Sequence, residues 1–268
     1  MTSTAARIAT AAGVVCLALA APVDARADSA AECTAGNFCY CVDTALKAAI
    51  DQQVAAIRSV IAKQRSQGKA IGYLSVPLST IEGSYLPVNA KVAAQVKEQI
   101  EDRFGVRAAW VLNPGAASFS LPQGTSGAAY MLMWTRVLEG DDGLAPDFDF
   151  VYFVGPADFT KFFGLDGRAD MEKLDAYYDG LAKTDTGVSS INKVKFRNYY
   201  ALRASVAFSL GSHDEWNIVR SINTKRRDAD KQAGIVKQLA VFFEGRAVPP
   251  GMYEAPIQPG TAGACAVN

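Results

Sequence analysis

Small hydroxyl, amide and carboxylate side chains follow three apolar runs that have the character of buried strands. Ser75, Ser79 and Thr80 follow the first run, Asn113 follows the second, and Asp158 follows the third. In an open α/β sheet, ligands bind beyond the carboxyl ends of the strands, so these side chains are predicted to line a ligand site. The alternative is turn formation alone, because Ser, Asn and Asp are common in any turn.

Arg203 is a further candidate, because it is the one cation in an apolar pattern with helical spacing. The pattern consists of Phe196, Tyr199, Arg203, Val206 and Leu210. A buried guanidinium needs an anionic partner, and an anionic ligand or Asp158 would supply one. The alternative places Arg203 at the edge of the pattern, with its head group in water.

The sequence lacks the motifs of several common sites. No Gly-x-Gly-x-x-Gly or Walker motif follows a predicted strand, so a nucleotide cofactor is not supported. His213 is the only histidine, which excludes a zinc site built from several histidines. The formal net charge is +0, whereas nucleic acids and anionic membrane surfaces call for a basic face. We expect no cofactor, no metal and no nucleic-acid partner.

The segment Ile71 to Leu78, followed by Gly83 to Tyr85, resembles the first strand and loop of nucleoside deoxyribosyltransferase-like proteins. In that family, an apolar strand ends in a turn of a small residue and proline that holds a ribosyl group, and a catalytic glutamate lies further along the chain. The family's glutamate motif has no match in this sequence. The resemblance therefore implies a cleft of this kind and assigns no catalytic residue.

The apolar periodicity predicts that helices and strands alternate. The predicted strands run from 71 to 76, 108 to 112 and 148 to 154, and the predicted helices run from 43 to 68, 87 to 105, 128 to 138 and 170 to 183. Residues 113–126 are predicted to form a long surface loop that covers the site. Strands joined by single helices form parallel sheets, so the expected fold is a three-layer, Rossmann-like α/β sandwich with a mainly parallel sheet.

The C-terminal portion is predicted to be helical. The stretch from 190 to 210 is ambiguous at its start and helical later. Ser212 and Glu215 have the spacing of a capping box, which predicts a helix that begins at Ser212 and ends near Asn223. The last predicted helix runs from 230 to 243.

Residues 1–27 have the pattern of an export signal. Arg7 precedes an apolar run from Ala11 to Ala21, and the small residues Ala25 and Ala27 lie at positions −3 and −1 of a cleavage site before Asp28. The alternative is an uncleaved membrane anchor. After cleavage we expect no membrane span, a cysteine-containing segment at 28–42, an α/β domain at 43–246, a proline-rich tail at 247–268 and a periplasmic or secreted location.

Four cysteines remain after cleavage: Cys33, Cys39, Cys41 and Cys265. In an oxidising compartment, an even number predicts disulfides. Because a bond between Cys39 and Cys41 would strain the backbone, one of them is expected to join Cys33 and the other to join Cys265, which ties the termini together. A redox-active or metal-binding cluster is the alternative.

These features predict an exported soluble α/β protein that binds a small molecule or a protein partner at the carboxyl edge of its sheet. The alternative is an extracytoplasmic small-molecule enzyme of the glycosyl-transfer or hydrolase type, with a nucleoside deoxyribosyltransferase-like cleft. A nucleophile beside a base with a shifted pKa would favour the enzyme, and the sequence singles out no such pair.

Cleavage after Ala27 should leave Asp28 at the N-terminus of the exported protein, because Ala25-Arg26-Ala27 has the small residues that signal peptidase requires. Intact-mass and N-terminal peptide measurements on exported protein check this outcome. Recovery of a chain that begins at Met1 from the membrane fraction would contradict it.

Overall fold

The computed structural model describes residues 29–78, 81–205, 209–233, 237–249 and 265. Its centre is a five-stranded sheet with the strand order β4-β3-β5-β6-β7. The strands are β3 (Ala70–Ser75), β4 (Ala109–Leu112), β5 (Phe150–Phe153), β6 (Ala240–Phe243) and β7 (Arg246–Ala247). All neighbouring pairs are parallel except β6 and β7, which are antiparallel. The predicted α/β class with a mainly parallel sheet is confirmed.

Strands β3 and β5 form the middle of the sheet and are buried on both faces. Residues 71–75 of β3 and all residues of β5 are buried. Burial on both faces requires a continuous apolar run, which is why the sequence located these strands correctly. Gly72 leaves room for the neighbouring ring, since a Cβ atom there would lie 2.2 Å from Phe150.

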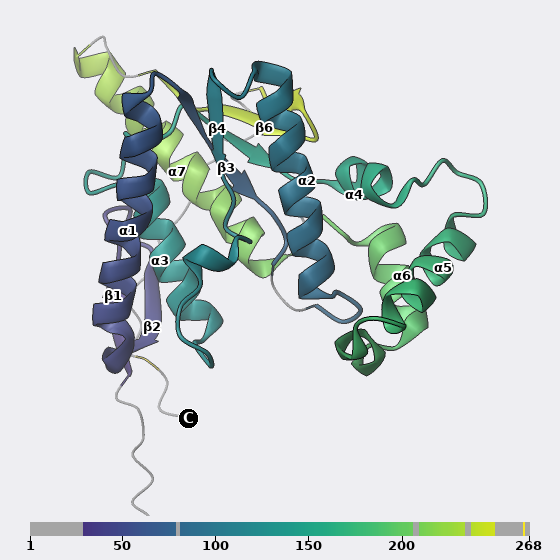
Figure 1. Cartoon of the computed structure of the whole chain (residues 1–268). Coiled ribbons are helices and arrows are strands. Elements are labelled where there is room, and N and C mark those ends of the chain that lie inside the picture. Colours follow the sequence, from purple (N-terminus) through teal and green to yellow (C-terminus); the bar gives the residue numbers. More distant parts are fainter. Residues whose placement is uncertain (1–28, 79–80, 206–208, 234–236, 250–264, 266–268) are drawn as a thin grey trace, which may run out of the picture.

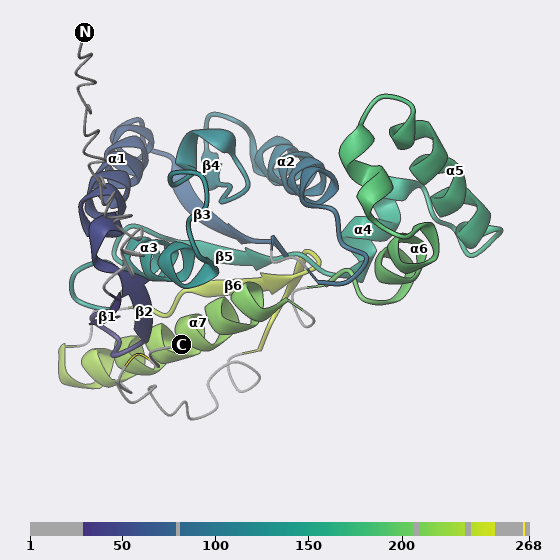
Figure 2. The same ribbon diagram turned by 90° about the horizontal axis from the view of Figure 1, so that it is seen from below.

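Helices cover both faces of the sheet (Figure 1). On one face, α1 (Lys47–Ser66), α3 (Gly127–Glu139) and α7 (Leu210–Ala233) bury side chains such as Ile57 and Ile218. On the other face, α2 (Leu86–Phe104) and α4 (Pro156–Phe163) bury side chains such as Val92 and Phe159. Figure 2 shows α2 on one side of β5 and β6 and α7 on the other.

Between β5 and α7, the chain forms a group of short helices beside the sheet (Figure 1). The group consists of α4, α5 (Asp170–Ala182), the 3-10 helix η3 (Thr186–Ser190) and α6 (Lys193–Leu202). Aromatic rings hold it together, with centroid distances of 5.9 Å between Phe159 and Tyr200 and 4.5 Å between Phe196 and Tyr200. The first of these helices, α4, begins at Pro156, a favourable first helical residue.

The predicted start of α7 is wrong. The helix begins at Leu210, and the residue before it, Ser209, accepts a hydrogen bond at Oγ from the backbone N–H of Ser212 (3.4 Å). Ser209 therefore occupies the capping position that the sequence assigned to Ser212. Glu215 lies in the second turn of the helix and has a different role, described below.

The predicted helix from 230 to 243 is correct only for residues 230–233, which are the last turn of α7, and it is wrong for Ala240–Phe243, which forms the strand β6 beside β5. Four successive apolar residues suit a strand between two neighbours. Asn223 of α7 positions this strand: its side chain accepts from the N–H of Leu239 (2.7 Å) and donates to the Leu239 carbonyl (3.2 Å). The C-terminal portion thus completes the sheet.

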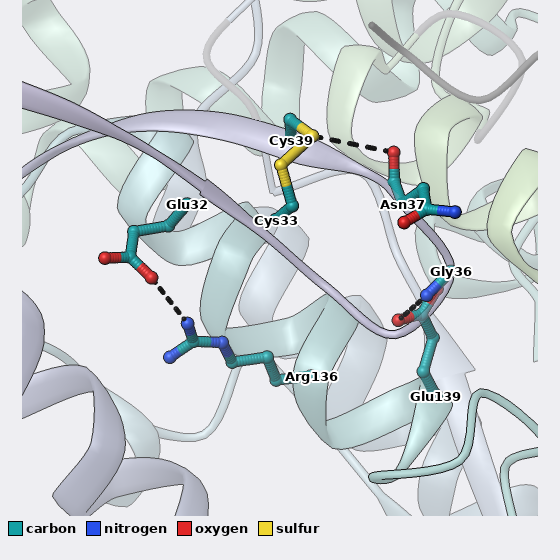
Figure 3. The surroundings of a disulfide bond; sticks show 7 residues. All are labelled: Glu32, Cys33, Gly36, Asn37, Cys39, Arg136 and Glu139. Carbon is teal, nitrogen blue, oxygen red and sulfur yellow. Dashed lines mark hydrogen bonds and ion pairs between the residues drawn. A yellow bond between two sulfur atoms is a disulfide. The ribbon is translucent and has the colours of Figure 1, made fainter. Parts of the chain in front are cut away.

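An N-terminal hairpin of β1 (Ser29–Cys33) and β2 (Cys39–Asp43) packs on α3. Figure 3 shows the Cys33–Cys39 disulfide, together with the hydrogen bond from the Gly36 N–H to Glu139 (3.1 Å). Cys41 is bonded to Cys265. Of the two pairing schemes that the sequence left open, the structure has Cys33 with Cys39 and Cys41 with Cys265.

Across the described residues, no helix combines the length and the apolar character needed to cross a membrane.

Removing the two disulfides separately should have unequal effects. The Cys41–Cys265 bond closes a sequence separation of 224 residues and the Cys33–Cys39 bond a separation of 6. Loop-closure entropy of the unfolded chain predicts losses in the free energy of unfolding of about 5 kcal/mol for C41S/C265S and about 2 kcal/mol for C33S/C39S. Urea denaturation of the two double variants measures both values. Equal losses, or a greater loss in C33S/C39S, would contradict the loop-closure argument.

Candidate functional site

Two hydroxyl groups at the carboxyl end of β3 meet one carboxyl group of α7. Tyr73 Oη donates to Glu215 Oε1 and Ser75 Oγ donates to Glu215 Oε2, both at 2.5 Å. Alternate residues of a strand point to the same face, so Tyr73 and Ser75 both point toward α7. All three side chains are buried, with exposed fractions of 0% for Tyr73 and Ser75 and 6% for Glu215.

The sequence of α7 places Glu215 against the sheet. Glu215, Ile218 and Ile222 recur at helical spacing, and both isoleucines are buried. A carboxyl therefore takes one position of an otherwise apolar stripe. The adjacent Trp216 packs against Phe153 of β5, with a centroid distance of 4.6 Å.

Burial dominates the electrostatics of this site. It raises the pKa of Glu215 to about 7, although the hydrogen bonds from Ser75 and Tyr73 act in the opposite direction. Burial and the nearby Glu215 carboxyl also raise the pKa of the Tyr73 phenol well above its ordinary value. Near neutral pH, Glu215 can therefore either hold or release a proton, as a general acid or base must.

The position of this cluster in the sheet matters for ligand binding. From β3 the chain crosses to β4 on one side, and from β4 it returns past β3 to β5 on the other side. The carboxyl ends of β3 and β5 thus form a topological switch point, where open α/β sheets bind their ligands. Ser75 is the last residue of β3, so the Tyr73, Ser75 and Glu215 cluster lies at this point.

The residues predicted from strand ends have different surroundings. Ser75 belongs to the cluster. Asn113 is buried and accepts a hydrogen bond from the Gly115 N–H (2.9 Å), which is turn formation. Asp158 accepts from Tyr152 Oη (2.9 Å) and from the Gly155 N–H (3.0 Å), and so caps α4. Ser79 and Thr80 lie outside the described residues.

Arg203 is exposed and follows the last residue of α6. Of the two alternatives, a buried cation is therefore wrong, and Arg203 reaches water. Among the described residues, Arg203 makes no ion pair with Asp158. The pKa of Glu82 is lowered chiefly by its ion pair with Lys195, and the charge of Arg203 contributes to the same effect.

The sequence analysis missed Glu215 as a site residue. The sequence does contain a signal for this residue, namely a glutamate at one position of an otherwise apolar helical stripe. Arg203 was singled out by the same kind of signal in residues 196–210. The spacing of Ser212 and Glu215 predicted instead that the two residues cap a helix.

An open depression of about 610 Å³ lies between residues 81–87 and residues 190–195, where Ile81, Tyr85 and Ile191 pack against the side chains that α2 and α4 bury. Its charged side chains, Glu82 and Lys195, form an ion pair, and Ser84 donates to the Ile81 carbonyl (2.7 Å). Tyr73, Ser75 and Glu215 do not line it. No group of three or more His, Cys, Asp or Glu side chains suited to a metal ion occurs in the described part of the chain.

Comparison with protein-family models, curated proteins and solved structures found no match to this chain. The function must therefore be argued from the site itself.

Replacing Glu215 by Gln should change how stability depends on pH. The folded-state pKa of about 7 exceeds the ordinary value of 4.5, so between these pH values the folded protein binds more protons than the unfolded chain. The contribution of Glu215 to the free energy of unfolding is then fully present below pH 4.5 and falls by about 3 kcal/mol as the pH rises through 7, a loss that E215Q should not show.

Urea denaturation of both proteins at pH 5 and pH 8 measures this difference. The matched control is Glu98→Gln, which changes an exposed glutamate on α2 and should keep the pH dependence of the wild type. If the free energy of unfolding changes equally with pH in wild type and E215Q, Glu215 is ionised across this range.

Proposed function

We propose that this protein is an exported small-molecule enzyme of the glycosyl-transfer or hydrolase type, which works at the carboxyl edge of a Rossmann-like, three-layer α/β sandwich. The observation that carries the proposal is the 2.5 Å hydrogen bond from Ser75 to Glu215, with Tyr73 on the second carboxyl oxygen. A hydroxyl beside a carboxyl with a shifted pKa, oriented by a third group, is the arrangement of general acid–base or nucleophilic catalysis.

The chemistry needs one carboxyl that can change its protonation state. In the proposed hydrolysis, protonated Glu215 gives its proton to the leaving atom as the bond to the transferred group breaks. Water then attacks the transferred group and returns one proton to the Glu215 carboxylate, so atoms and protons balance with water as the only co-reactant. Tyr73 and Ser75 fix the orientation of the carboxyl during both steps.

Two features support the extracytoplasmic location in this proposal. Residues 1–27 have the pattern of an export signal. The described chain also carries the Cys33–Cys39 and Cys41–Cys265 bonds, which persist in oxidising compartments.

A second candidate function is binding without turnover, of a small molecule or a protein partner at the same edge. The observation that favours it is the complete burial of Tyr73 and Ser75. In that case the cluster fixes α7 on the sheet, and the ligand contacts only the loops above it.

Turnover of a set of p-nitrophenyl glycosides and nucleosides, followed by release of nitrophenol or free base, tests the proposal. E215Q should lower the rate at least about 100-fold, because general acid–base catalysis contributes that much or more, whereas Glu98→Gln should keep the wild-type rate. A rate that survives in E215Q would remove Glu215 from the mechanism. Ligand binding by calorimetry without turnover in the wild type would favour the second candidate.

A further inference from the structure

Ser212 carries a hydroxyl that the described structure leaves unused. The residue is 2% exposed, and its Oγ atom has no hydrogen-bond partner. Its backbone N–H donates to Ser209 Oγ, so the main chain of Ser212 serves the helix cap while the side chain does not. An unpaired buried hydroxyl lowers the stability of the folded state.

Most of the other buried polar atoms without a partner in the described structure differ from this hydroxyl. In four residues a different side-chain atom forms an ion pair or hydrogen bond, namely Arg58, Arg197, Asp175 and Glu139. Gln64 is only half-buried as a residue. The hydroxyl of Thr34 lies close enough to Glu139 to lower the pKa of that carboxyl. Ser212 has only one polar side-chain atom, so its entire hydrogen-bonding capacity is available.

The geometry of α7 puts this hydroxyl beside the proposed site. Residues three apart on a helix share a face, so Ser212 lies on the Glu215 face, one turn nearer the N-terminus. Because α7 is followed by β6, which begins at the amino edge of the sheet as the parallel strand β5 does, the N-terminal turn of α7 lies toward the carboxyl edge. Ser212 therefore lies nearer the carboxyl edge of the sheet than Glu215, which is bonded to Ser75.

The charges around the cluster decide what kind of ligand fits. The charged groups that act directly on Glu215, Tyr73 and Tyr40 within the described residues are acidic, namely Asp214, Glu139 and Glu215 itself, whereas the basic groups His213 and Lys225 act on Asp214 and Glu139. A phosphate group would meet repulsion from these carboxyls. A neutral ligand with hydroxyl groups could instead donate to Ser212 or Glu215 and accept from Ser212.

We propose that Ser212 Oγ and the Glu215 carboxyl form a subsite for the hydroxyl groups of a neutral, hydroxyl-rich small molecule, and that phosphorylated forms are disfavoured. This inference rests on the proposed function and names its ligand class. Ser212 is a binding residue in this arrangement, because its hydroxyl has no partner among the described residues and can pair with a ligand hydroxyl.

Ser212→Ala should have opposite effects on stability and binding. In the free protein the melting temperature should rise by about 2 to 4 °C, because an unpaired buried hydroxyl is removed. The control is Ser66→Ala, which removes an exposed helical hydroxyl bonded to the Lys63 carbonyl and should not raise the melting temperature. Scanning calorimetry measures both variants.

Binding is measured by titration calorimetry with two pairs of probes that differ in one phosphate: glucose and glucose 6-phosphate, and adenosine and adenosine 5′-monophosphate. At least one neutral probe should bind at least about tenfold more tightly than its phosphorylated form, and S212A should weaken that binding about five- to tenfold. S66A should bind as the wild type does.

Three outcomes would overturn the inference: a lower melting temperature in S212A, unchanged binding of the neutral probe in S212A, or no preference for a neutral probe, including no binding of either one. Each is distinguishable from failure of the proposed function, which depends on E215Q and the turnover of glycosides and nucleosides. If E215Q abolishes turnover while S212A changes nothing, only the Ser212 subsite is wrong.

Discussion

The buried carboxyl of Glu215 is the constraint on which the arrangement of this fold depends. A carboxyl removed from water needs hydrogen-bond donors or a bound proton, and Tyr73 and Ser75 supply two donors from alternate positions of one strand. Only one placement of α7 along β3 brings both hydroxyls to both carboxyl oxygens. That placement also carries Asn223 to Leu239, immediately before β6. The Glu215 contact thus helps to position the last strands of the sheet.

The N-terminal hairpin contributes to the same cluster indirectly, because it contacts α3 and α3 packs against Tyr73. Trp134 of α3 packs edge-on against Tyr73, with a centroid distance of 6.3 Å. The neighbouring Thr135 hydroxyl is hydrogen-bonded to Tyr40 Oη of β2 (2.9 Å), and Arg136 is paired with Glu32 of β1 (3.1 Å). The Cys33–Cys39 bond holds the hairpin together and the Cys41–Cys265 bond ties it to the tail, so the disulfides reinforce the support of the Tyr73, Ser75 and Glu215 cluster, which lies on other elements.

The sequence predicted the elements whose pattern is local and missed those that tertiary contacts decide. β3 and β5 were found because burial on both faces leaves a continuous apolar run. β6 was missed, since the four residues Ala240–Phe243 follow a helix closely and only their pairing with β5 makes them a strand. Ser75 was predicted as a site residue from its place at a strand end. Glu215 was not, because Ser-x-x-Glu looks the same whether it caps a helix or sends a carboxyl into the core.

Two partly or fully buried carboxyls near the carboxyl edge, Asp158 and Glu215, show why burial alone does not make an acid–base group. Burial raises the pKa of both. Asp158 accepts from the backbone N–H of Gly155 at one oxygen, and because this donor cannot accept in return, a proton on Asp158 can reside only on the other oxygen, which is bonded to the Tyr152 hydroxyl. Among the described residues, Glu215 is bonded to hydroxyls at both oxygens, and hydroxyls can turn from donor to acceptor when the carboxyl takes up a proton. Either oxygen of Glu215 can therefore carry the proton without loss of a hydrogen bond, whereas one oxygen of Asp158 stays committed to capping α4.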